Sequence, residues 1–153
     1  MRLLNELHRR LREIPGDQAT VVKVSDDRLG IDLHLTDWNH LGCLLEGLAL
    51  ERRCGDPLAL DPTRIVEEIT YLEEGLAIIE NEIDGGRVVL RSSPPRIEGR
   101  NTSFFQMDLN HRQGLSLRRY NYDRHLGQRL PIAAPLSNAT LERLITDLVQ
   151  LAD

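Results

Sequence analysis

The sequence is short of the residues and motifs on which most functional assignments rest. Its 153 residues include two cysteines and one tryptophan, aromatic residues make up 4%, and Lys23 is the only lysine. Cys43 and Cys54 are too few and too loosely spaced for a disulfide framework or a zinc knuckle, so we expect reduced thiols. The sequence contains no glycine-rich phosphate loop, Cys-x-x-Cys pair, His-Glu-x-x-His motif or Gly-x-Ser-x-Gly elbow. We therefore expect no cofactor, and the absence of these motifs disfavours an enzyme.

Long hydrophobic runs are also missing. No stretch approaches the roughly 20 apolar residues that a membrane helix needs, and Glu46, Glu51 and Glu80 interrupt the longest candidates. Residues 1–14 alternate leucine with charge and lack the apolar region and cleavage site of a signal peptide. We expect a cytoplasmic protein that makes no membrane contact. Its length and its 41% of apolar residues suit a single domain over residues 1–153.

Charge is unevenly distributed along the chain. The net charge of −5 disfavours a general binder of polyanions. Residues 42–86 carry 11 Asp or Glu and 3 Arg, a net of −8, whereas residues 87–129 carry 9 Arg and 3 Asp or Glu, a net of +6. Eighteen arginines to one lysine is typical of a GC-rich genome, so the clustering of arginine is more informative than its abundance. The two blocks can neutralise each other within one chain or between two chains.

The N-terminal third predicts a helix followed by a hairpin. Apolar residues recur at helical spacing up to the stop at Pro15-Gly16, at Leu3, Leu4, Leu7, Leu11 and Ile14. Residues 20–25 and 29–35 then alternate apolar and polar side chains around Asp26-Asp27-Arg28, which is typical of two paired strands.

Residues 37–53 are compatible with two periods. A helical period joins Leu41, Leu44, Leu45 and Leu48. A strand period fits Leu44, Leu48 and Leu50. We favour a helix that begins at Asp37 as its N-cap and turns into a strand near Leu50. A short second helix is predicted to begin at Asp61-Pro62, and its end stays open because residues 70–76 also resemble a tight hairpin with Gly75 in the left-handed conformation.

The second half of the chain predicts two more hairpins. Residues 76–83 and 88–92 flank Asp84-Gly85, a dipeptide that favours a type I′ turn. Residues 93–102 contain Pro94-Pro95, which cannot donate ladder hydrogen bonds, and are expected to form an exposed loop. That loop includes the factor Xa recognition sequence of residues 97–100.

Residues 103–109 and 115–122 form the next predicted hairpin. If Leu109 faces Leu115, one surface of the pair is mostly apolar, and the other is polar and aromatic. After a connector from Pro131 to Pro135, Ser137 or Asn138 is expected to cap a final helix. Its apolar stripe is Leu141, Leu144, Ile145 and Leu148.

Taken together, these segments predict an α+β fold. An antiparallel sheet built from hairpins is flanked by an N-terminal and a C-terminal amphipathic helix, with one or two middle helices. The order of elements resembles that of the small acidic dimeric secretion chaperones, although no motif is shared. At the level of fold, that resemblance implies a non-enzymatic module that binds a protein.

The polar and aromatic surface of the hairpin at 103–122 is the candidate binding surface. It comprises Phe104, Gln106, Arg118, Tyr120 and Tyr122. Arginine and ring planes on one strand face are typical of proteins that stack on bases. The alternative is that Arg87, Arg91, Arg118 and Arg119 pair with the acidic strands that precede them. We favour this alternative and expect the acidic residues 65–84 to neutralise Arg118 and to repel phosphate.

The remaining candidate is a metal site formed by His34, Asp37 and His40, where Asp37 and His40 would share a helix face. Helix capping by Asp37 explains the same residues without a metal. The leading functional hypothesis is a protein-binding adaptor, regulatory or chaperone-like domain that forms a homodimer. A nucleic-acid-binding domain is the alternative, although nucleic acid is an unlikely partner on charge grounds. An enzyme with an unrecognised site comes third.

Overall fold

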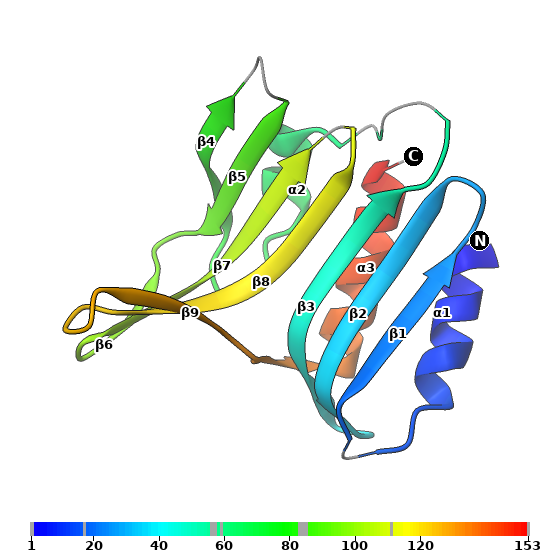
Figure 1. The fold of residues 1–153 in the computed structure, drawn as a ribbon, viewed down its shortest axis with the longest axis horizontal. Helices are drawn as coiled ribbons and strands as arrows, with labels where there is room; N and C mark the ends of the chain where they lie inside the picture. The colour runs from blue at the N-terminus through cyan, green and yellow to red at the C-terminus, as the bar shows by residue number, and fades with distance from the viewer. Residues whose placement is uncertain are drawn as a thin grey trace.

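The computed structural model describes residues 2–16, 18–55, 58, 60–82, 86–110 and 112–152. Within them the chain forms three helices and ten strands, which is an α+β architecture (Figure 1). In chain order the elements are α1 (Arg2–Arg12), β1 (Thr20–Ser25), β2 (Leu29–Trp38), β3 (Gly42–Arg52), α2 (Pro62–Glu68), β4 (Leu76–Glu82), β5 (Arg87–Ser92), β6 (Arg96–Glu98), β7 (Asn101–Asn110), β8 (Gly114–Asp123), β9 (Gln128–Ile132), β10 (Ala134–Ser137) and α3 (Asn138–Ala152).

All ten strands belong to one antiparallel sheet. Its main order is β1-β2-β3-β8-β7-β5-β4, with β10 paired to β3, β6 to β7 and β9 to β8. Strands β3 and β8 pair only over residues 48–51 and 114–117. Further along, β10 pairs with β3 and β9 pairs with β8, so the two long strands separate and the segment 128–137 borders both.

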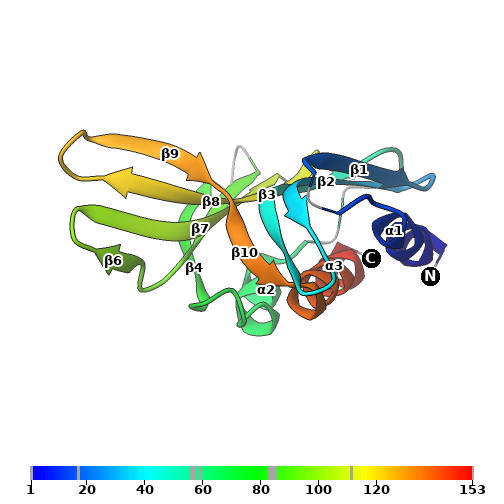
Figure 2. The ribbon, with the colours of Figure 1, turned by 90° about the horizontal axis from the view of Figure 1, so that it is seen from below.

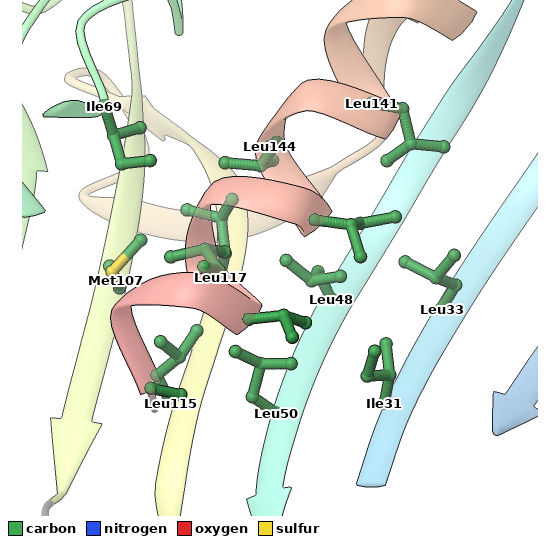
Figure 3. Packing of buried hydrophobic residues seen from close by; sticks show 14 of the residues in the cluster. Ile31, Leu33, Leu48, Leu50, Ile69, Met107, Leu115, Leu117, Leu141 and Leu144 are labelled. Carbon is green, nitrogen blue, oxygen red and sulfur yellow. The ribbon is translucent and has the colours of Figure 1, made fainter. Parts of the chain in front are cut away.

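The three helices lie on the same side of the sheet (Figure 2). The antiparallel sheet with helices at both ends of the chain and one in the middle is confirmed, and all three helices cover one face of the sheet. One hydrophobic cluster fills the space between helices and strands (Figure 3), and it includes Leu48 and Leu50 of β3, Leu117 of β8 and Leu144 of α3. Among the described residues, no helix is long and apolar enough to cross a membrane.

The helix signals at both ends of the chain and at Asp61-Pro62 are confirmed. Helix α1 buries Leu3, Leu4, Leu7 and Leu11. Asp61 caps α2 by accepting a hydrogen bond from the Thr63 backbone N–H at 2.9 Å. At the start of α3, the Ser137 hydroxyl oxygen accepts from the backbone N–H of Thr140 at 3.1 Å. Such caps satisfy amide groups that have no partner within the helix.

The prediction of a helix over residues 37–53 is wrong, because β2 continues to Trp38 and β3 occupies residues 42–52. Asn39 closes the turn between them, where its side-chain oxygen accepts hydrogen bonds from the backbone of Leu41 and Gly42. A β-bulge explains the misleading period. Glu46 has no partner in β2, since the register moves from His34↔Gly47 to Leu35↔Leu45. Leu45 and Leu48 consequently both face the core although they are three residues apart.

The hairpin of residues 76–83 and 88–92 is confirmed in the described part of the chain, where β4 pairs with β5 from Leu76↔Ser92 to Glu82↔Arg87. Its expected turn at Asp84-Gly85 lies outside the described residues. The alternative hairpin over residues 70–76 is wrong, because these residues lead from α2 into β4. The left-handed conformation there belongs to Glu73, with φ 61°, and Gly75 does not adopt it.

Two segments expected to be irregular contain strands. Residues 93–102 are mostly exposed, as expected, but β6 pairs within them with the start of β7. The prediction of an irregular connector over residues 131–135 is also wrong, because Pro131 lies in β9 opposite Tyr120 and Pro135 lies in β10 opposite Leu44. Both strands pair on one side only within the described sheet. Proline is compatible with such an edge because its missing N–H is not required there.

Pairing of β6 protects the factor Xa recognition sequence of residues 97–100. Cleavage after Arg100 requires residues 97–100 to enter the protease as a free extended segment, but Ile97 and Glu98 pair with β7. The Arg100 side chain also forms an ion pair with Asp123 at 3.3 Å. We expect the native protein to resist an amount of factor Xa that cuts the urea-unfolded chain completely, as measured by electrophoresis over time. Equal cleavage rates would contradict the pairing of β6.

Candidate binding surface

The face of the sheet opposite the helices carries the side chains predicted from the sequence. Strands β7 and β8 pair in the predicted register, with Phe104 opposite Tyr120 and Gln106 opposite Arg118. Neighbouring residues on the same strands, such as Phe105 and Leu117, belong to the core cluster, so alternation directs the predicted set to the other side. We call this side of β5, β7, β8 and β9 the open face. All five predicted surface residues lie on it.

Gln106 is the centre of a polar network on the open face, with only 5% of its surface exposed. Its amide nitrogen donates to Asp108 Oδ2 at 3.1 Å. Its carbonyl oxygen accepts two hydrogen bonds, from Arg91 Nε at 2.8 Å and from Arg129 Nη1 at 3.0 Å. Asp108 in turn accepts from Arg87 at 3.3 Å. Two guanidinium groups therefore converge on one neutral oxygen.

The same two arginines cover the aromatic rings of the open face. The Arg91 guanidinium lies 5.0 Å from the centre of the Phe104 ring, and that of Arg129 lies 4.0 Å from the centre of the Tyr120 ring. These distances are typical of cation–π contacts. Phe104 is only 8% exposed, whereas Tyr122 is 38% exposed. The outward surfaces of Phe104 and Tyr120 are therefore already occupied by arginine.

Most of the positive charge on the open face has no counter-ion among the residues that the structure describes. Arg87 pairs with Asp108 at 3.3 Å. For Arg91, Arg118 and Arg129, no carboxylate of the described residues lies within 4.0 Å. The Arg118 side chain extends over Gly47 of β3.

The expectation that the acidic residues 65–84 neutralise Arg118 is therefore wrong. Strand β4, which carries Glu80 and Glu82, lies at the sheet edge and is separated from β8 by β5 and β7. Neighbouring strands are about 4.8 Å apart, so β4 is too distant for a direct ion pair with Arg118. Of the four arginines named in that expectation, Arg119 is the one that pairs with a described residue of the acidic block, through Glu73 at 3.1 Å, and it lies on the core side of β8.

A cleft of about 780 Å³ lies beside this network, at the end of the sheet where β3 and β8 pair. Its lining includes the small side chains of Ala49 and Ser116, which are cross-strand neighbours, and the carboxylate of Asp108. The volume is within the range of small-molecule sites. Its described lining contains no histidine, cysteine or lysine. The groups of this lining with nucleophile or general-base chemistry are the Ser116 hydroxyl and the carboxylates of Glu51 and Asp108, and Asp108 already accepts hydrogen bonds from Gln106 and Arg87.

The proposed metal residues are not gathered into a site. His34 lies opposite Gly47 in the β2–β3 pair, and Asp37 lies further along β2 beyond the bulge. The Asp37 carboxylate accepts from the Trp38 backbone N–H at 2.8 Å, so its predicted role as a helix N-cap is wrong. His40 lies in the turn after β2. Within the described part of the chain, no group of three or more His, Cys, Asp or Glu residues is placed to hold a metal ion.

The buried thiol of Cys43 is also poorly suited to chemistry. Burial raises its pKa to about 11, although a backbone hydrogen bond to Leu136 acts in the opposite direction. The thiolate is the reactive form of cysteine, and this pKa leaves very little of it near neutral pH.

Sequence reasoning missed Arg129 and assigned Arg91 to the wrong partners. Arg129 pairs with Tyr122 in the β8–β9 ladder. Because a connector is predicted to begin at Pro131, the sequence does not indicate that Arg129 lies in a strand next to the aromatic residues. The available signal was the alternation of Arg129 and Pro131 on one side with Leu130 and Ile132 on the other.

Comparison with known proteins adds no relative to this description. No family model, no curated protein and no solved structure matches the chain.

Proposed function

We propose that this chain is a non-enzymatic protein-binding domain whose open face receives an acidic segment of a partner protein. The observation that carries this proposal is the set of three arginines, Arg91, Arg118 and Arg129, that have no carboxylate partner among the described residues. They share one face with Tyr122, and the helices leave that face uncovered.

General properties of protein interfaces support this proposal. Arginine and tyrosine are enriched among the residues that contribute most to binding energy. Complementary charge accelerates association and discriminates against the wrong partners. An acidic partner segment would supply carboxylates to Arg91, Arg118 and Arg129. The acidic block of a second copy has the same chemistry, so a homodimer is part of this proposal.

Nucleic-acid binding is the second candidate, and the unneutralised Arg118 on the same strand face as the exposed Tyr122 favours it. Two observations weigh against it. Arginine side chains cover the rings of Phe104 and Tyr120, although base stacking needs an accessible ring surface. The net charge of −5 also opposes approach of a polyanion.

The experiment that tests the proposal is selection of a random peptide library on the purified protein, followed by calorimetry with the selected peptides. We expect the selected peptides to be rich in Asp and Glu. Replacement of Arg118 by Gln should weaken their binding roughly 10-fold, because a hydrogen bond to a charged group contributes about 1.5–3 kcal/mol. The matched control is Arg64→Gln, which removes the same charge from α2 on the opposite side of the molecule.

Three outcomes would contradict protein binding at this face. The first is that the library yields no enriched peptide, and the second is that Arg64→Gln weakens peptide binding as much as Arg118→Gln. The third is tight binding of single-stranded RNA that falls steeply with salt and is lost in the Arg118→Ala, Tyr122→Ala double variant. Such salt dependence is the signature of phosphate contacts and would make nucleic acid the better assignment.

A further inference from the structure

We infer that Arg91, Arg129 and Gln106 form a receptor for a single carboxylate, which an aspartate or glutamate side chain of the partner supplies. This inference rests on the proposed function and names the chemical group that the open face recognises. Arg91 comes from β5, Gln106 from β7 and Arg129 from β9, so the receptor exists only when these three strands are assembled.

The receptor is held in place before any ligand arrives. Gln106 is buried, and its amide nitrogen is fixed by the hydrogen bond to Asp108, which Arg87 also contacts. This bond turns the Gln106 carbonyl oxygen toward Arg91 and Arg129. The two aromatic rings support the guanidinium groups from below. Preorganised donors of this kind lose less conformational entropy on binding.

The charge of the receptor defines its ligand. Two like charges repel at short distance, and here the group between them is a neutral amide. Each guanidinium donates one hydrogen bond to Gln106 and retains further N–H donors. A carboxylate has two oxygens and one negative charge, so it can accept from both guanidiniums and relieve their repulsion.

The surroundings favour a carboxylate over a phosphate polymer. Asp108 lies directly beside Gln106. On the neighbouring strand β4, Glu80 lies opposite Val89 and Glu82 opposite Arg87, two and four positions along β5 from Arg91. These acidic groups would repel a run of phosphates, whereas one carboxylate contacts only the two arginines. The nearby Phe104 and Tyr120 rings cannot add base stacking while arginine covers them.

A labelled peptide of alternating glutamate and alanine, amidated at its C-terminus, tests the receptor by fluorescence anisotropy at constant salt. The same peptide with glutamine in place of glutamate is the control ligand. We expect the glutamate peptide to bind and the glutamine peptide not to bind. Arg91→Gln and Arg129→Gln should each lower the affinity for the glutamate peptide roughly 10- to 100-fold, because each removes charge-assisted hydrogen bonds. Arg64→Gln should leave binding unchanged.

Gln106→Glu tests the receptor most directly, because it places a carboxylate of the protein itself between Arg91 and Arg129. We expect it to abolish peptide binding while the far-UV circular dichroism spectrum stays unchanged. Repulsion from Asp108 could unfold this variant, so the Gln106→Glu, Asp108→Asn double variant is the second measurement. Binding that persists in a folded Gln106→Glu protein would overturn the inference.

The remaining outcomes separate this inference from the proposed function. Peptides from the library that bind the open face but ignore Arg91→Gln and Arg129→Gln would overturn the receptor and leave protein binding intact. A wild-type protein that binds library peptides but not the glutamate peptide would do the same. Equal affinity for oligothymidylate, or strong competition by inorganic phosphate, would replace the carboxylate with phosphate. Concentration-dependent dimers that Gln106→Glu dissociates would identify a second copy as the source of the carboxylate and support the receptor.

Discussion

Replacement of Gly114 by alanine is expected to lower the free energy of unfolding by more than about 3 kcal/mol. A Cβ at this position would lie 1.9 Å from the backbone oxygen of Leu50 and 2.9 Å from its carbonyl carbon. The backbone φ of +139° is also one that residues with a side chain rarely adopt. The obstacle is backbone, so no side-chain rotation can relieve the contact.

The location of Gly114 makes this contact important for the whole sheet. Gly114 pairs with Glu51 in the short β3–β8 ladder, which has four residue pairs. That ladder joins the strands β1, β2 and β3 to the strands β8, β7, β5 and β4. Displacing β8 from β3 would therefore disturb the core beneath both halves.

Urea and thermal denaturation measure this effect. Gly75→Ala is the matched control, because a Cβ there meets no atom within 4 Å and the φ of Gly75 is not positive. The control should stay within about 0.5 kcal/mol of the wild type. A Gly114→Ala protein with the denaturation midpoint of the wild type would show that β3 and β8 do not approach so closely.

Glu73→Gln is expected to lower the free energy of unfolding by about 3 kcal/mol, because it leaves a buried cation without its counter-ion. Arg119 is 5% exposed, and its Nη2 atom lies 3.1 Å from Glu73 Oε2 and 2.8 Å from the Ser103 hydroxyl. Its guanidinium also lies 4.8 Å from the centre of the Phe105 ring, and its Nη1 atom has no hydrogen-bond partner. Glu73 lies at the solvent end of this contact, with 36% of its side chain exposed, whereas the Arg119 guanidinium that loses its counter-ion is buried.

Double-mutant analysis checks this explanation. Arg119→Met removes the charge itself, so the Glu73→Gln, Arg119→Met double variant should be more stable than Glu73→Gln alone. Glu98→Gln is the control, since Glu98 forms an exposed ion pair with Arg96 and such pairs contribute about 0–1 kcal/mol. Strictly additive effects of the two core variants would show that Glu73 does not stabilise Arg119.

The parts of the fold that depend on near neighbours were predictable. The β7–β8 hairpin formed in the expected register because Leu109 and Leu115 flank a short turn and place apolar residues on one side. The start of α2 follows from Asp61 and Pro62, and the start of α3 follows from Ser137. In each case the decisive interaction joins residues that are few positions apart.

The predictions are wrong where the local structure depends on pairing with a strand that is distant in the sequence. The spacing of Leu45 and Leu48 predicts a helix, because the bulge at Glu46 is defined only by pairing with β2. The prolines of residues 131–135 disfavour a central strand and predict a connector, whereas tertiary structure pairs Pro131 with β8 and Pro135 with β3.

The sequence alone established which surface of the β7–β8 hairpin faces outward, because side chains alternate along a strand whatever surrounds it. It thereby placed Phe104, Gln106 and Tyr120 together on that surface. Only the tertiary structure decided which arginines join them. Arg91 and Arg129 are 38 positions apart in the chain, and they meet at Gln106 because β5 and β9 lie on opposite sides of the β7–β8 pair. The order of strands in a sheet depends on how the whole core packs, and no local pattern of residues records it.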